Sequence, residues 1–155
     1  NEWIRTHYVG ALKRKQTPLQ TPGFFLDVTE WQQLYNQFNR PRVPEHIAQP
    51  ASARYYGMME KAQRAPFAVL DDIGVRNVTE GFRSDLHVII NHRVTNNLPT
   101  VYTSNLPIKY REAKSVALMP YDLEDLLGER RLADRVGDRC IELTFKGESK
   151  RGKRK

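Results

Sequence analysis

The stretch from Phe67 to Gly74 constrains the fold of this chain more than any other. Four apolar residues, Phe67 to Leu70, run directly into Asp71 and Asp72. A short, continuous apolar run with polar residues at its end is typical of a strand that is buried on both faces of a parallel sheet. Ligands of open parallel sheets bind beyond the carboxyl ends of the strands, which is where the two carboxylates would lie.

Two adjacent carboxylates at a strand end repel each other unless a cation or a shared proton relieves the repulsion. The pattern therefore favours a Walker B motif, in which one aspartate supports a hydrated Mg²⁺ and a second acidic group orients or activates the water that attacks a γ-phosphate. The alternative is a strand that ends in a turn whose carboxylates cap backbone amides. The pattern alone leaves both interpretations open.

The chain has 155 residues and a net charge of +7, which is the length of one globular domain or of part of one. Most of the positive excess lies in residues 139–155, which carry seven Lys or Arg and two Glu. A basic tail suggests an anionic partner such as nucleic acid, although a solvated chain end has the same composition. The single Cys140 fits a reducing cytoplasm, and no stretch has the length of a membrane span or the pattern of a signal peptide.

Strand patterns alternate with helix patterns along the chain, which predicts an α/β domain with a mainly parallel sheet. The expected strands cover residues 24–28, 67–70, 99–103 and 140–145. Helical spacing is expected over residues 1–8, 29–39, 52–63, 79–95 and 123–136. Thr29 and Asp122 are the predicted N-caps of two of these helices, and residues 40–50, with three prolines, are a predicted loop.

Five short motifs occur in one order: LDDIG (70–74), IINHR (89–93), LPT (98–100) with TSNL (103–106), LGER (127–130) with ADR (133–135), and GESKR (147–151). In this order and spacing they resemble the DnaC/DnaI/IstB ATPases, which are AAA+ proteins that load the replicative helicase or assist a transposase. The resemblance covers about residues 24–151. Each motif alone is weak, whereas five in order are specific.

The resemblance implies a P-loop NTPase (AAA+) fold, in which a parallel sheet has helices on both faces and forms three layers. Residues 1–147 would be the ATPase core downstream of Walker A, and residues 148–155 a basic C-terminal tail. It further implies ATP and Mg²⁺ as cofactors, a homo-oligomer with ATP at the subunit interfaces, and no membrane. A replicative helicase and single-stranded DNA would be the partners.

The resemblance also implies roles for individual residues. Asp71 matches the aspartate that supports Mg²⁺, and Asp72 stands where many AAA+ proteins have the catalytic glutamate. Asn105 resembles sensor 1, a neutral polar side chain that holds the attacking water or the γ-phosphate. Arg135 resembles the arginine finger that is presented to ATP on a neighbouring subunit, and Arg151 resembles a sensor 2 arginine.

An alternative interpretation applies to Arg135. Arg131 and Arg135 are four residues apart, so they share a helix face and could both reach an anion. Together with Asp134 and Asp138, however, they could equally form a solvated face of salt bridges.

One departure from the family is large, because no Gly-Lys-Ser or Gly-Lys-Thr occurs anywhere in the sequence. The chain is therefore expected to begin just after the phosphate-binding loop, with the first strand and Walker A absent. In the family that strand lies at the centre of the sheet, here between the strands expected at 99–103 and 140–145. Residues 1–155 alone are accordingly expected to be inactive and not to fold as a self-sufficient domain.

The sequence thus predicts, for the complete protein, an ATP-dependent DNA replication factor that delivers a helicase to single-stranded DNA. Two alternatives remain open. One is an IstB-like helper ATPase for transposition, which would act on duplex DNA. The other is a non-catalytic module that binds DNA or a helicase through a degenerate ATPase core.

Overall fold

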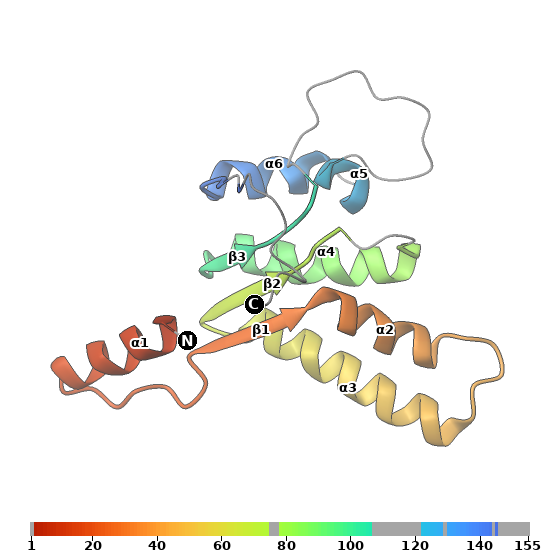
Figure 1. Ribbon diagram of the computed structural model, residues 1–155, viewed down its shortest axis with the longest axis horizontal. Helices are drawn as coiled ribbons and strands as arrows, with labels where there is room; N and C mark the ends of the chain where they lie inside the picture. Colours follow the sequence, from red (N-terminus) through yellow and green to blue (C-terminus); the bar gives the residue numbers. More distant parts are fainter. Residues whose placement is uncertain (1, 75–77, 107–121, 129, 144, 146–155) are drawn as a thin grey trace, which may run out of the picture.

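Helices and strands alternate along the chain in the computed structural model, which describes residues 2–74, 78–106, 122–128, 130–143 and 145 (Figure 1). The elements, in chain order, are α1 (Glu2–Lys13), β1 (Gly23–Asp27), α2 (Val28–Phe38), α3 (Glu45–Arg64), β2 (Phe67–Asp71), α4 (Glu80–Thr95), β3 (Thr100–Tyr102), α5 (Leu123–Leu127) and α6 (Arg130–Arg139). No helix in these described ranges combines the length and the apolar character that crossing a bilayer requires.

The three strands form one parallel sheet in the order β1-β2-β3. Asp27 at the end of β1 pairs in register with Asp71 at the end of β2, and Leu70 pairs with Tyr102 of β3. The strand β2, which leads into Asp71 and Asp72, is therefore the middle one of the described sheet. This confirms the predicted α/β class with a parallel sheet and places the carboxyl ends of all three strands at one edge.

The hydrophobic core covers one face of the sheet. Leu26, Ala68 and Leu70 are fully buried, and because strand residues alternate between faces, all three point to the same side. The helices α2, α3 and α4 supply the opposing side chains, among which Trp31 stacks on Tyr55 at 4.6 Å between ring centroids. In Figure 1, α2 and α3 run side by side to the lower right of β1, and α5 and α6, drawn at the top, contact α4.

The other face of the sheet is largely uncovered among the described residues. Phe25 and Val101 point to it and are 58% and 44% exposed. The helix α1 reaches this face at one point, where Trp3 stacks on Phe67 with 4.4 Å between the ring centroids. The predicted arrangement with helices on both faces is therefore found only in part.

The predicted helix over residues 79–95 is confirmed almost to the residue. Its helical stripe is buried as expected, from Phe82 through Leu86 to Ile89 and Ile90. The Thr79 side chain accepts a hydrogen bond from the N–H of Phe82 and so caps the helix. The helix returns the chain from the carboxyl edge of β2 to the start of β3.

Two predicted boundaries were wrong near the N-terminal half of the core. The N-cap of α2 is Asp27 and not Thr29, because the Asp27 carboxylate accepts the N–H of Glu30 at 3.0 Å. The loop predicted over residues 40–50 is shorter, because α3 begins at Glu45 and includes Pro50. Pro50 lacks an N–H and removes one helical hydrogen bond, but the helix continues through it to Arg64.

Two further predictions were wrong near the C-terminus. The single helix expected over residues 123–136 is divided by Gly128, whose φ of 68° ends α5 in the left-handed conformation that glycine tolerates best. The predicted N-cap Asp122 is confirmed. The strand predicted over residues 140–145 is absent from the described part of that segment, where Ile141 and Phe145 are 89% and 92% exposed. Its alternating pattern permits a strand, but a strand also needs a neighbour to pair with.

Candidate functional site

The carboxyl edge of the sheet gathers the polar side chains that the sequence singled out. Asp27 and Asp71 end neighbouring strands in register, and Asp72 follows directly. Thr103 and Asn105 come from the segment that continues β3. Side chains from three separate stretches of sequence therefore meet at this edge, as the parallel topology requires.

Thr103 joins the two adjacent aspartates. Its hydroxyl donates a hydrogen bond to Oδ1 of Asp71 at 2.5 Å and accepts one from the backbone N–H of Asp72 at 2.8 Å. Among the residues that the structure describes, no hydrogen bond reaches the second carboxylate oxygen of Asp71. In this part of the chain, Oδ2 is therefore the Asp71 oxygen that remains available as an acceptor.

Asp72 has a left-handed backbone, with a φ of 58°. This conformation is uncommon outside glycine but is tolerated by aspartate and asparagine. The Asn105 amide donates to Oδ1 of Asp72 at 3.3 Å, and the Thr29 hydroxyl donates to Oδ2 at 3.4 Å. Both bonds are long, so the carboxylate is held loosely between the N-terminus of α2 and the segment after β3.

Main-chain hydrogen bonds fix the segment after β3 against the segment after β2. The Thr103 N–H donates to Leu70 O at 3.1 Å, and the Ile73 N–H donates to Thr103 O at 2.8 Å. The Ser104 hydroxyl donates to Ile73 O. Gly74 has a φ of 145°, which only glycine adopts readily, and a Cβ there would lie 3.4 Å from Ser104 Oγ.

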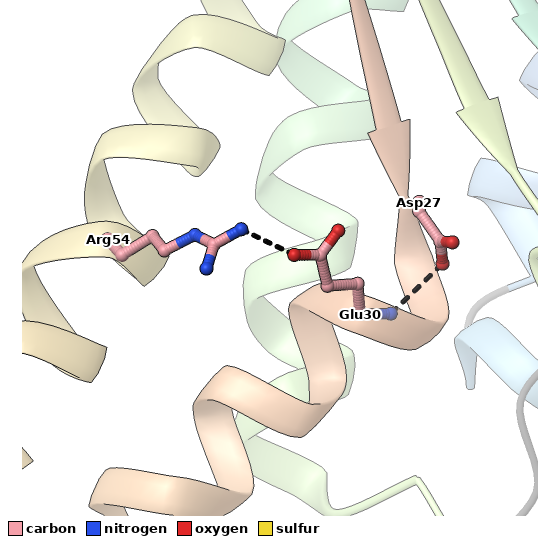
Figure 2. Close-up of polar contacts among 3 residues, drawn as sticks. All are labelled: Asp27, Glu30 and Arg54. Carbon is pink, nitrogen blue, oxygen red and sulfur yellow. Dashed lines mark hydrogen bonds and ion pairs between the residues drawn. The ribbon is translucent and has the colours of Figure 1, made fainter. Parts of the chain in front are cut away.

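The first turn of α2 stands beside this edge and is itself anchored (Figure 2). Figure 2 shows the Asp27 carboxylate bonded to the backbone nitrogen of Glu30, while the Glu30 side chain reaches Arg54 of α3 at 2.5 Å. The pair is about half exposed, so its contribution to stability is small. It joins the first turn of α2, which carries Thr29, to α3.

The donors at this edge suit Mg²⁺ in kind, since carboxylate and hydroxyl oxygens are the ligands that this cation prefers. No cluster of three or more His, Cys, Asp or Glu side chains able to hold a metal occurs within the described ranges. Oxygen ligands of this kind bind Mg²⁺ through one or two carboxylates, with water completing the coordination shell.

Arg135 lies elsewhere. Its guanidinium donates to the Asn91 side chain at 3.0 Å, and Asn91 is in the last third of α4. The distance along the helix from Glu80 to Asn91 is about 16 Å at the usual rise per residue. The structure thus brings Asp71, Asp72 and Asn105 together but leaves Arg135 exposed on another part of the molecule. Arg151 lies outside the described residues.

Three residues of the edge were missed by sequence reasoning: Thr103, Thr29 and Asp27. Thr103 and Asp27 could have been found, because each stands at the end of a strand next to β2 and parallel strands end at the same edge. Thr29 was interpreted as a cap, and the hydroxyl instead contacts Asp72. The roles assigned to Asp71, Asp72 and Asn105 stay predictions.

Comparison with known proteins gave a match among solved structures alone. Neither a family model nor a curated protein sequence matches the chain. Among solved structures, the chain matches the crystal structure of the DnaC helicase loader with a TM-score of 0.49 and 20% sequence identity. The match covers 88% of this chain and spans 66% of the length of that structure.

Proposed function

We propose that this chain is the part downstream of the phosphate-binding loop in an ATP-dependent DNA replication factor of the helicase-loader type. In this proposal ATP and Mg²⁺ bind at interfaces between identical subunits, and hydrolysis controls the grip on a replicative helicase and on single-stranded DNA. The order of the five sequence motifs supports the assignment to this class. The chain itself contains no Gly-Lys-Ser or Gly-Lys-Thr, so the activity belongs to the complete protein.

The observation that carries the proposal is the meeting of Asp71, Asp72 and Asn105 at the carboxyl edge of the middle strand. Within the described residues one carboxylate oxygen of Asp71 accepts no hydrogen bond, and the proposal assigns this oxygen to a hydrated cation. The Asn105 side-chain nitrogen lies 3.3 Å from Oδ1 of Asp72. An acidic and a neutral polar group are thus close enough to bind the same water molecule and direct it at a phosphate. Magnesium would supply charge neutralisation at the phosphates when bound.

Asp71→Asn and Asp72→Asn in the complete protein test the proposal. Asp71→Asn is expected to weaken Mg²⁺-dependent ATP hydrolysis, because the amide cannot supply the anionic oxygen that holds the hydrated cation. Asp72→Asn is expected to keep ATP binding and to lower the hydrolysis rate about 100-fold or more. Asparagine also tolerates the left-handed backbone at position 72, so the substitution leaves the turn intact.

The matched control is Asp138→Asn on the exposed face of α6, which changes charge by the same amount away from the edge. Its hydrolysis rate should equal that of the unchanged protein. Unchanged hydrolysis in both Asp71→Asn and Asp72→Asn would refute the catalytic assignment of these two residues. Absence of hydrolysis in the unchanged complete protein would instead leave a non-catalytic binding module as the better description.

The pathway is tested separately from the chemistry. We expect the complete protein to bind single-stranded DNA more tightly than duplex DNA and to form a complex with a hexameric replicative helicase. Fluorescence anisotropy with labelled strands and gel filtration with the helicase measure the two properties. A preference for duplex DNA with no helicase complex would favour the transposition helper.

A further inference from the structure

The polarity of the Thr103 hydrogen bonds is fixed by their partners. A hydroxyl has one proton and two lone pairs. The backbone N–H of Asp72 can only donate, so it takes a lone pair of Thr103 Oγ1 at 2.8 Å. The single hydroxyl proton is then directed to Oδ1 of Asp71 at 2.5 Å, which an ionised carboxylate accepts.

The position of that hydroxyl is itself set by the sheet. The backbone of Thr103 is bonded through its N–H to Leu70 O and through its carbonyl to the N–H of Ile73. These two bonds bracket the aspartate pair on the neighbouring chain segment. Thr103 therefore cannot shift relative to Asp71 without breaking main-chain hydrogen bonds.

The consequence for Asp71 is a fixed carboxylate plane. With Oδ1 held by Thr103, rotation about the last side-chain bond is restricted and Oδ2 keeps one direction. For Asp72 the same hydroxyl accepts the N–H of a residue whose left-handed backbone turns its side chain toward Asn105. One hydroxyl thus supports the orientation of both carboxylates.

We propose that Thr103 is a positioning residue of the nucleotide-hydrolysis site, which orients Asp71 toward the hydrated cation and holds the backbone turn that presents Asp72. The inference rests on the proposed function. It assigns to the segment after β3 a second task beside that of Asn105. The pairing of a hydroxyl with a cation-binding carboxylate follows the general rule that groups behind a metal ligand fix its orientation and its affinity.

The test compares Thr103→Val with Thr103→Ser in the complete protein. Valine keeps the shape and removes both hydrogen bonds, whereas serine keeps the hydroxyl. Thr103→Val is expected to raise the Mg²⁺ concentration for half-maximal hydrolysis at least about 10-fold, and Thr103→Ser to stay within about twofold of the unchanged protein. Thr95→Val at the exposed end of α4 is the matched control.

Two further measurements do not depend on turnover. Electron paramagnetic resonance with Mn²⁺ and ATP should show the same loss of metal affinity in Thr103→Val. In ¹H–¹⁵N spectra the amide of Asp72 should move upfield and exchange faster with solvent, because it has lost its acceptor. If Thr103→Val does not fold, Thr103→Ala replaces it in the same comparison.

The outcomes distinguish the proposed function from the proposed role of Thr103. Absence of ATP hydrolysis and of metal-dependent nucleotide binding in the unchanged protein would refute the proposed function. An active unchanged protein whose Thr103→Val variant is folded and has the same Mg²⁺ dependence and the same Mn²⁺ affinity would refute the role of Thr103 alone.

Discussion

Arg93 is a charged side chain with no exposed surface. The sequence of α4 does not predict that this arginine is buried. Its guanidinium donates to three carbonyl oxygens at the end of α3, to Pro99 O and to the Thr100 hydroxyl. Burial lowers the pKa of Arg93, while the carbonyls offer the negative end of a helix dipole to the charge. One residue therefore ties the end of α3 to the start of β3.

Arg93→Met should destabilise the complete protein by about 3 kcal/mol or more, because it leaves several buried carbonyls without donors. Arg93→Lys should recover little, since one ammonium cannot reproduce the planar fork of the guanidinium. Urea unfolding followed by tryptophan fluorescence measures the loss. Arg64→Ala is the control, because the ion pair of Arg64 with Glu60 is exposed and should contribute less than about 1 kcal/mol. Equal midpoints for the two variants would show that the buried hydrogen bonds do not stabilise the fold.

The start of α2 connects the sheet to the candidate site. Asp27 ends β1, caps α2 and stands in register with Asp71. The chain thus passes from strand to helix without an intervening loop. Thr29 comes one residue into the helix and reaches Asp72. A substitution of the N-cap should consequently also disturb the contact between Thr29 and Asp72.

Asp27→Ala should lower the stability of the complete protein by about 1 kcal/mol, whereas Asp27→Ser should restore most of it because serine is also a good N-cap. Thr29→Val should have little effect on thermal melting, since its bond to Asp72 is long and exposed. Calorimetry of the three variants distinguishes the two possible caps. A larger loss for Thr29→Val than for Asp27→Ala would show that Thr29 is the cap after all.

The elements that could be predicted from sequence are those whose signal is local. The apolar run before Asp71 and the helical stripe from Phe82 to Ile90 each depend on neighbouring residues, and both were found. The strand expected over residues 140–145 had a local pattern but depends on a partner elsewhere in the chain. Pro50 was placed in the predicted loop over residues 40–50, although the helix α3 extends through this position.

The candidate site was predictable to a similar degree. Asp71, Asp72 and Asn105 follow apolar strands, so their meeting at one edge follows from parallel pairing. The left-handed backbone of Asp72 and the two hydrogen bonds of the Thr103 hydroxyl could not be predicted. Both depend on how the segments after β2 and β3 pack against each other. Such details need three-dimensional placement and leave no periodic trace.

The positive charge of the chain sets the behaviour that we expect toward nucleic acid. The net charge is +7, and residues 150–155 contain five Lys or Arg. Replacing Lys153, Arg154 and Lys155 by glutamine should reduce the affinity for single-stranded DNA. It should also flatten the salt dependence, by a slope of ~0.7 for each phosphate contact that is lost. Titrations at several salt concentrations measure both. An unchanged affinity and slope would exclude a role for these residues.

Arg135 bears on whether ATP hydrolysis requires more than one copy of the chain. Its guanidinium is bonded to α4 and not to the carboxyl edge of its own chain, so a role at the nucleotide requires a second copy that presents it. Arg135→Ala should then abolish ATP hydrolysis in the complete protein. Arg139→Ala is the matched control, because Arg139 is also exposed and donates to the side chain of Asn97, just after α4.

Mixing Arg135→Ala with Asp72→Asn protein should restore part of the activity. In a head-to-tail assembly of equal amounts, roughly a quarter of the interfaces would combine an intact Asp72 on one copy with an intact Arg135 on the next. Hydrolysis in the mixture should therefore rise well above that of either variant alone, to no more than about that fraction of the unchanged protein. Gel filtration must show that both variants assemble. Co-assembly without any recovery of hydrolysis would show that Arg135 acts within its own chain, through its contact with Asn91.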